Sequence, residues 1–251
     1  GIAAHAEATG RMHLITTAVE HKAVLEPVEV LSKRGFEVTV LPVDEKGWPT
    51  AADLTDALRD ETVLVSTLHG NNETGVELPL EDYAAVLSNH DAWWHVDAAQ
   101  TYGKRNEVLS DKRIDLISIS GHKVFAPKGI GALIVRRRGY ERPPLTALMY
   151  GGGQERGLRP GTLPVALVAS LGLAGQLAGQ EAVDRRESCE TFRKQVIDAL
   201  DSLGAEVNGD PGRVLPHVVN ASIPGVDAEA AIVAIKDLVA ISNGSACTSA
   251  S

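Results

Sequence analysis

A lysine in a short polar turn, directly after an apolar segment, is the residue with the clearest chemical potential in this chain. Residues 120–123 read Ser-Gly-His-Lys and follow residues 115–119, whose apolar character predicts a buried strand. Lys123 at the end of a strand is held in a fixed place, and Schiff-base formation requires a fixed amine that can lose its proton. Pyridoxal phosphate is the commonest cofactor that uses this chemistry. A solvated surface lysine is the alternative, so other segments must decide.

Three further polar positions follow predicted strands. Asp97 comes just past the strand predicted over residues 93–96; it could pair with a protonated pyridine nitrogen or serve as a helix N-cap. His21 opens a helix after the first strand, where its imidazole could stack on a flat cofactor ring, cap the helix or fill the core. Residues 69–75 (His-Gly-Asn-Asn-Glu-Thr-Gly) form a polar turn, and turn preference explains one asparagine more easily than the whole segment.

The chain has two cysteines, and their surroundings differ. Cys247 lies among small polar residues, so we expect a flexible loop with a solvent-reachable thiol that is nucleophilic once deprotonated. Cys189 falls in a helical segment and fits a buried, inert thiol. There is no Cys-x-x-Cys and no histidine–cysteine cluster at zinc spacing, so neither a disulfide framework nor a metal site is expected.

These residues must be positioned by elements that alternate between strand and helix, a pattern typical of βαβ units and a mostly parallel sheet. Strands are predicted over residues 13–17, 36–41, 63–67, 93–96, 116–119 and 132–135, and helices over residues 22–33, 51–58 and 80–87. Ligands of such sheets bind at the carboxyl ends of the strands. We therefore expect the polar segments after three of these strands to converge on one crevice.

The character of the chain changes after the three glycines at residues 151–153. A long helix is predicted over residues 164–203, with Gly179 as a candidate for a break. A strand over 218–223, a helix over 228–236 and a short strand over 238–241 follow. We expect a large cofactor-binding domain over residues 1–163, then a linker helix and part of a small domain over residues 164–251. Neither end carries a closing element, which indicates a fragment of a longer protein.

Composition limits the function classes. The 251 residues are 44% hydrophobic with a formal charge of −9 and a pI of about 5.4, which excludes generic attraction to nucleic acid or anionic membranes. No signal peptide is evident, and the longest apolar stretch, around residues 165–175, is too short to cross a bilayer. A reduced, cytoplasmic setting is expected.

Taken together, six segments resemble the group I cysteine desulfurases of the class V aminotransferase family. The matching segments are residues 17–25 (Thr-Ala-Val-Glu-His-Lys-Ala-Val-Leu), 69–75, 95–100 (His-Val-Asp-Ala-Ala-Gln), 118–123 (Ser-Ile-Ser-Gly-His-Lys), 151–164 (Gly-Gly-Gly-Gln-Glu-Arg-Gly-Leu-Arg-Pro-Gly-Thr-Leu-Pro) and 242–249 (Ser-Asn-Gly-Ser-Ala-Cys-Thr-Ser). The resemblance implies an α/β fold of type I: a mostly parallel sheet with helices on both faces, plus part of a smaller α/β domain. It also implies bound pyridoxal 5'-phosphate.

The resemblance implies a role for each matching residue. Lys123 would form the Schiff base and move the substrate α-proton, His21 would stack on the ring and assist proton transfer, and Cys247 would accept the sulfur. The cofactor would be held by Asp97 at the ring nitrogen, Gln100 at the phenolic oxygen, Ser120 and His122 at the phosphate, and Thr162 at the phosphate of a neighbouring subunit. Asn72 would also belong to the cofactor-binding residues, and it would hold the substrate carboxylate.

The implied reaction converts L-cysteine to L-alanine and leaves a persulfide on Cys247 for a sulfur-acceptor protein, a scaffold or a carrier. Thr162 implies a homodimer. Iron–sulfur assembly, tRNA thiolation, DNA sulfur modification and cofactor synthesis all draw on this chemistry, and the sequence does not choose among them. A selenocysteine lyase, an aminotransferase or a non-catalytic protein of the same fold are the alternatives. A family threonine upstream and a carboxylate-binding arginine downstream are missing, so we expect weak cofactor binding and poor turnover from this chain alone.

Overall fold

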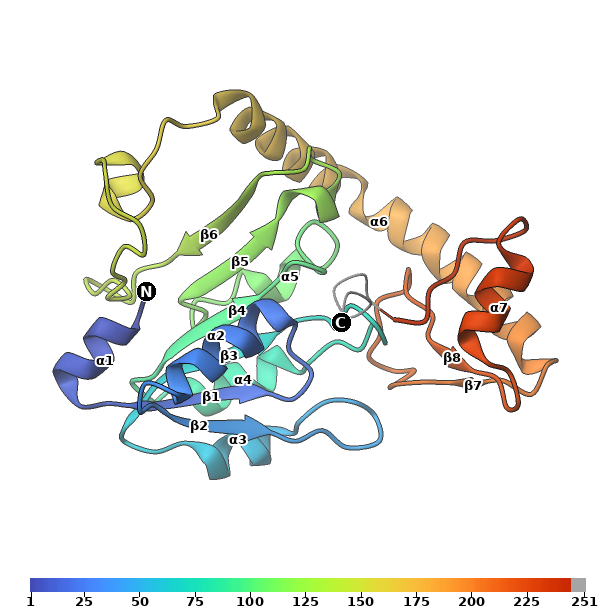
Figure 1. Ribbon diagram of the computed structural model, residues 1–251, viewed down its shortest axis with the longest axis horizontal. Helices are drawn as coiled ribbons and strands as arrows, with labels where there is room; N and C mark the ends of the chain where they lie inside the picture. Colours follow the sequence, from blue (N-terminus) through green and yellow to red (C-terminus); the bar gives the residue numbers. More distant parts are fainter. Residues whose placement is uncertain (245–251) are drawn as a thin grey trace.

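A six-stranded sheet forms the centre of the computed structural model, which describes residues 1–244 (Figure 1). The strand order is β2-β1-β3-β4-β5-β6; the first five strands run parallel, and β6 is antiparallel to β5. The strands are β1 (His13–Thr17), β2 (Glu37–Leu41), β3 (Thr62–Leu68), β4 (Trp93–Asp97), β5 (Leu116–Ser120) and β6 (Gly131–Val135). The predicted mostly parallel sheet is confirmed.

Helices connect the strands and continue beyond them. They are α1 (Ala3–Thr9), α2 (Lys22–Ser32), α3 (Ala51–Ala57), α4 (Leu80–Leu87), α5 (Asn106–Leu109), the 3-10 helices η1 (Gly121–Val124) and η2 (Gln154–Gly157), α6 (Val165–Asp201) and α7 (Ala228–Ile235). A two-stranded antiparallel sheet of β7 (Glu206–Val207) and β8 (Ala221–Ser222) lies beside α7 in Figure 1.

The sheet buries both of its faces, because successive strand residues point to opposite sides. On one face, Trp94 of β4 packs in a cluster with Leu54 of α3 and Tyr83 of α4. On the other face, Trp93 packs in a second cluster with Ala6 of α1. The expectation of helices on both faces is confirmed.

The order of the strands creates a switch point between β1 and β3. The chain leaves β1 for β2 on one side of it and then returns to build β3, β4 and β5 on the other side. In sheets of this kind the crevice outside the carboxyl ends at the switch point is where ligands bind. The ends of β1, β3, β4 and β5 are therefore the place where a site is expected.

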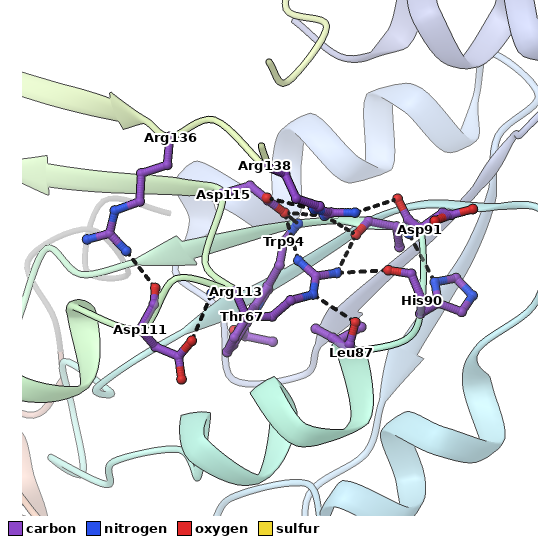
Figure 2. A network of polar contacts seen from close by, with 11 residues as sticks. Thr67, Leu87, His90, Asp91, Trp94, Asp111, Arg113, Asp115, Arg136 and Arg138 are labelled. Carbon is purple, nitrogen blue, oxygen red and sulfur yellow. Dashed lines mark hydrogen bonds and ion pairs between the residues drawn. The ribbon is translucent and has the colours of Figure 1, made fainter. Parts of the chain in front are cut away.

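A buried ion-pair network fixes the opposite, amino end of β5 (Figure 2). Asp115, which is 2% exposed, directly precedes β5. Its Oδ2 accepts hydrogen bonds from Arg113 Nη1 at 2.8 Å, from Arg138 Nη2 at 2.7 Å and from the Trp94 N–H at 2.8 Å. These bonds join the start of β5 to β4 and to the end of β6, so that the far ends of β4 and β5 stay in register.

The second half of the chain differs from the sequence-based expectation in three places. Helix α6 runs unbroken through Gly179, because one glycine costs a long helix only about 1 kcal/mol. The strand expected over residues 218–223 is limited to β8, and residues 238–241 form no strand. A strand forms only where a partner strand is within reach.

In the first half of the chain, residues 3–9, for which the sequence predicted no element, form α1. The domain boundary at residue 163 stays a prediction.

Within residues 1–244, no helix has both the length and the apolar composition that a bilayer crossing requires.

Candidate active site

A row of polar side chains crosses the carboxyl half of one sheet face. His95 of β4 bridges its two neighbouring strands: its Nδ1 lies 2.8 Å from Ser66 Oγ on β3, and its Nε2 lies 3.1 Å from Ser118 Oγ on β5. Burial holds the pKa of His95 below its ordinary value, which favours the neutral imidazole that can both donate and accept. Because side chains alternate, Asp97 and Ser120 extend this polar row towards the strand ends.

Asp97 occupies the last position of β4, between the ends of β3 and β5. It is paired in the sheet with Leu68 and Ser118, and its carbonyl oxygen accepts the His69 N–H at 2.9 Å. Its carboxylate Oδ1 accepts the Ala99 N–H at 2.9 Å, which is an Asx-turn bond; residues 98–105 form no helix, so the N-cap alternative is wrong. This turn bond is compatible with a ligand-binding role, because it uses one of the two carboxylate oxygens.

Gln100 lies in the turn that follows Asp97. Its carbonyl oxygen accepts a hydrogen bond from Lys104 Nζ at 2.9 Å, four residues further on. This bond anchors the backbone of the turn and uses no atom of the Gln100 side chain. The role of the Gln100 amide at the cofactor stays a prediction.

The turn after β5 contains Lys123 and begins at Gly121, a position that accepts only glycine. A Cβ on Gly121 would lie 2.7 Å from the Ile130 carbonyl oxygen, which accepts the Gly121 N–H at 2.9 Å. Ser120 Oγ and His122 Nδ1 lie 3.0 Å apart, so the two predicted phosphate ligands touch each other. Lys123 is half-buried in η1 and lines a cavity of about 640 Å³ between η1 and α6.

His21 is positioned by the helix that it begins. Its Nδ1 accepts the Ala23 N–H at 3.1 Å, which caps α2 and leaves the ring proton of the neutral form on Nε2. Two bonds hold the turn that precedes it against the end of β3. Glu20 Oε1 accepts the Leu68 N–H, and Asn71 Nδ2 donates to the Val19 carbonyl oxygen at 3.1 Å. The β1–α2 turn therefore lies at the same sheet edge as residues 69–75.

Asn71 and Asn72 differ in their hydrogen bonds within the polar turn of residues 69–75. Asn71 Oδ1 accepts the N–H groups of Glu73 and Thr74 at 2.8 and 2.9 Å and so builds the turn. Asn72 is half-buried, and within residues 1–244 its side chain makes no hydrogen bond. The turn role expected of one asparagine is thus that of Asn71, and the substrate role of Asn72 stays a prediction.

The structure does not bring Thr162 to this sheet edge, and it does not test the position predicted for Cys247. Thr162 lies in an exposed segment between η2 and α6, and it forms no hydrogen bond with the other candidates in the described part of the chain. Its predicted role requires a second subunit. Cys247 lies outside the described residues.

Sequence reasoning missed two buried titratable residues beside the candidates. Glu20 is 6% exposed, and burial raises its pKa to about 8, with the charge of Asp97 acting in the same direction. His69 is 2% exposed, and burial lowers its pKa to about 4. The sequence showed only that each is a titratable residue near a predicted buried strand. It could not show that a turn buries them, because such burial depends on tertiary contacts.

Comparison with known proteins gives consistent matches. The family model described as "Aminotransferase class-V" matches residues 2–251. "Cysteine desulfurase, mitochondrial" of Saccharomyces cerevisiae is 44% identical over 244 residues, which is 96% of this chain and 48% of that protein. The chain thus spans about half the length of this curated relative.

Two solved structures extend the likeness to the fold. "Crystal structure of DndA from streptomyces lividans" aligns with a TM-score of 0.90 at 48% identity, covering 98% of this chain and 69% of that one. "SspA in complex with cysteine" aligns with a TM-score of 0.78 at 32% identity, covering 99% of this chain and 70% of that one. These matches confirm the predicted fold type I architecture.

Proposed function

The chain belongs to the class-V aminotransferase family, and on this premise we propose that the protein is a cysteine desulfurase that depends on pyridoxal 5'-phosphate. The names of the similar proteins support the activity, and SspA, one of the structural relatives, was solved in complex with cysteine. Because the chain spans about half of its curated relative, the activity is proposed for the whole protein.

The residues present fit this cofactor chemically. An amine, a carboxylate, an amide and a hydroxyl–imidazole pair follow the ends of β4 and β5, where a flat ring with an aldehyde, a basic nitrogen and a phosphate needs them. When bound, the cofactor supplies an electrophilic carbon and an electron sink. Lys123 would hold that carbon, Asp97 the ring nitrogen, Gln100 the phenolic oxygen, and Ser120 with His122 the phosphate. Thr162 would reach the phosphate of a partner subunit.

The other residues would act on the substrate. Asn72, whose side chain is uncommitted within the described chain, would hold the carboxylate of L-cysteine. Lys123 would move the α-proton, and His21 would stack on the ring and exchange a proton at Nε2. In the overall reaction, the carbon–sulfur bond of L-cysteine breaks and a sulfur–sulfur bond forms on Cys247. L-Alanine leaves with a proton on its β-carbon, so atoms and electrons balance.

The partners are part of the same proposal. A homodimer is supported by large apolar side chains that stand exposed before and along the start of α6, since monomers rarely leave such groups uncovered together. These side chains are Tyr140, Leu148, Met149, Tyr150, Leu163, Val165, Val168 and Leu173. A sulfur-acceptor protein and a cytoplasmic setting complete the proposal; the latter rests on cysteine usage.

One structural observation supports the proposed function more strongly than the rest. Asp97 and the Ser120–Lys123 turn end adjacent strands, and two turn bonds bring His21 and the Asn72 turn to the same edge across the switch point. A protein that had kept only the fold would have no physical need for this set of residue types in the turns after these strands.

The full-length protein with bound cofactor tests the proposal. We expect it to release L-alanine from L-cysteine, and we expect Lys123→Ala to abolish that release because Lys123 is the amine assigned to the cofactor. Lys128→Ala removes an exposed lysine five residues away and should leave the rate unchanged. Alanine release that survives Lys123→Ala would refute the assignment of the lysine. Transamination of L-cysteine without sulfur release would favour an aminotransferase.

A further inference from the structure

At the switch point, the pairing between β1 and β3 stops before β3 ends. The β1–β3 ladder pairs His13 with Thr62 and ends where Ile15 pairs with Val65, although β3 continues to Leu68. The Leu68 N–H consequently finds no acceptor on β1. A buried N–H without an acceptor costs free energy comparable to a lost hydrogen bond, so another group must take the place of the missing strand.

Glu20 fills this gap from the turn that follows β1. Its Oε1 accepts the Leu68 N–H and also the hydroxyl of Thr17, the last residue of β1, at 3.0 Å. One carboxyl group thus joins the ends of the two strands that diverge at the switch point. His21 is the next residue along the chain, so the position of its ring depends on the same turn.

The surroundings of Glu20 favour its neutral form. Besides burial, the nearby titratable groups are Asp97 on β4 and Tyr83 on α4, and both are acids whose ionisation opposes that of Glu20. The Leu68 N–H and the Thr17 hydroxyl act in the opposite direction. Because Oε1 already accepts two hydrogen bonds, the proton belongs on Oε2, which is buried and has no partner among the described residues.

We propose that Glu20 is a positioning residue of the active site: its carboxyl group bridges β1 and β3 and holds the β1–α2 turn, with His21, against the end of β3. The identity of the bound group rests on the proposed function, whereas the bridge is a property of the folded chain alone. Glutamine has the same shape and an acceptor oxygen, so it should replace the acid, and alanine should not.

Amide hydrogen exchange on the cofactor-free, full-length protein tests the bridge. We expect Glu20→Ala to raise the exchange rate of the Leu68 amide by about 10-fold or more, because the amide loses its acceptor, while the Val65 amide within the ladder is unaffected. Glu20→Gln should keep the slow exchange at both amides. Glu29→Ala removes an exposed glutamate of α2 and serves as the matched control.

Cofactor titration of the same variants tests the positioning. At pH 7 we expect Glu20→Ala to weaken pyridoxal phosphate binding by about 10-fold and to shift the pH midpoint of its visible absorbance band. Glu20→Gln should restore both.

The outcomes of these experiments distinguish the positioning role of Glu20 from the proposed function. Unchanged Leu68 exchange in Glu20→Ala, or a failure of glutamine to rescue, would overturn the positioning role. If the unmodified protein binds the cofactor but releases no alanine, only the proposed function fails. If the unmodified protein binds no cofactor, the active-site role falls with the proposed function, and the Leu68 rates alone then decide whether the bridge exists.

Discussion

Asp97 is the residue whose replacement reports most directly on the cofactor site. Asp97→Asn keeps the local bond to the Ala99 N–H, since the amide oxygen can also accept, but it removes the negative charge. We expect the affinity for pyridoxal phosphate to fall by about 10- to 100-fold, because a charge-assisted hydrogen bond of about 1.5–3 kcal/mol is lost. Cofactor titration measures this change. Asp60→Asn, at an exposed aspartate, should bind the cofactor normally; equal loss in both variants would contradict the assignment.

Glu20 gives the chain a measurable dependence of stability on pH. Its pKa is raised from 4.5 to about 8 in the folded chain, so the folded state holds a proton that the unfolded state releases. The free energy of unfolding should therefore fall as the pH rises from about 5 to about 8, by at most about 1.4 kcal/mol for each pH unit. Urea unfolding of the wild type at several pH values, against Glu20→Gln, measures the difference. Parallel pH profiles would show that Glu20 is not the source.

Several of the residues that the sequence predicted for the site share one feature, which is that they follow predicted strands. The carboxyl ends of parallel strands meet at one edge, so Asp97, Ser120 and Lys123 could be placed together from order alone. Glu20 and His69 also lie just after strands, but their order along the chain does not show that they are buried. Their importance depends on burial under turns from other parts of the chain, and burial is a tertiary property that neighbouring residue types do not reveal.

At the scale of elements, local sequence patterns predicted the strands of the six-stranded sheet well and those of the second half of the chain poorly. Every strand from β1 to β6 forms within one or two residues of its predicted bounds, because alternation with helices and apolar runs mark each one locally. The strand expected over residues 238–241 does not form. Strands need a pairing partner that is distant in the sequence, so a short apolar run is an ambiguous signal.

The network around Asp115 is the element-scale feature with the largest expected effect on stability. Asp115→Asn removes the charge that pairs with Arg113 and Arg138 and leaves two partly buried cations uncompensated. We expect a loss of about 3–5 kcal/mol in the free energy of unfolding. Urea unfolding of the full-length protein measures it, and Glu29→Gln, which breaks an exposed ion pair, should change little. A small effect of Asp115→Asn would mean that the network does not hold β5 in register.

At the scale of the whole molecule, the central claim is that the protein transfers sulfur from L-cysteine to Cys247. Intact-mass spectrometry of the full-length protein with bound cofactor, before and after L-cysteine, tests it most directly. We predict a gain of one sulfur atom that maps to Cys247, is absent in Cys247→Ser and Lys123→Ala, and persists in Cys189→Ser. A gain that maps to Cys189, or no gain while alanine is released, would contradict the account.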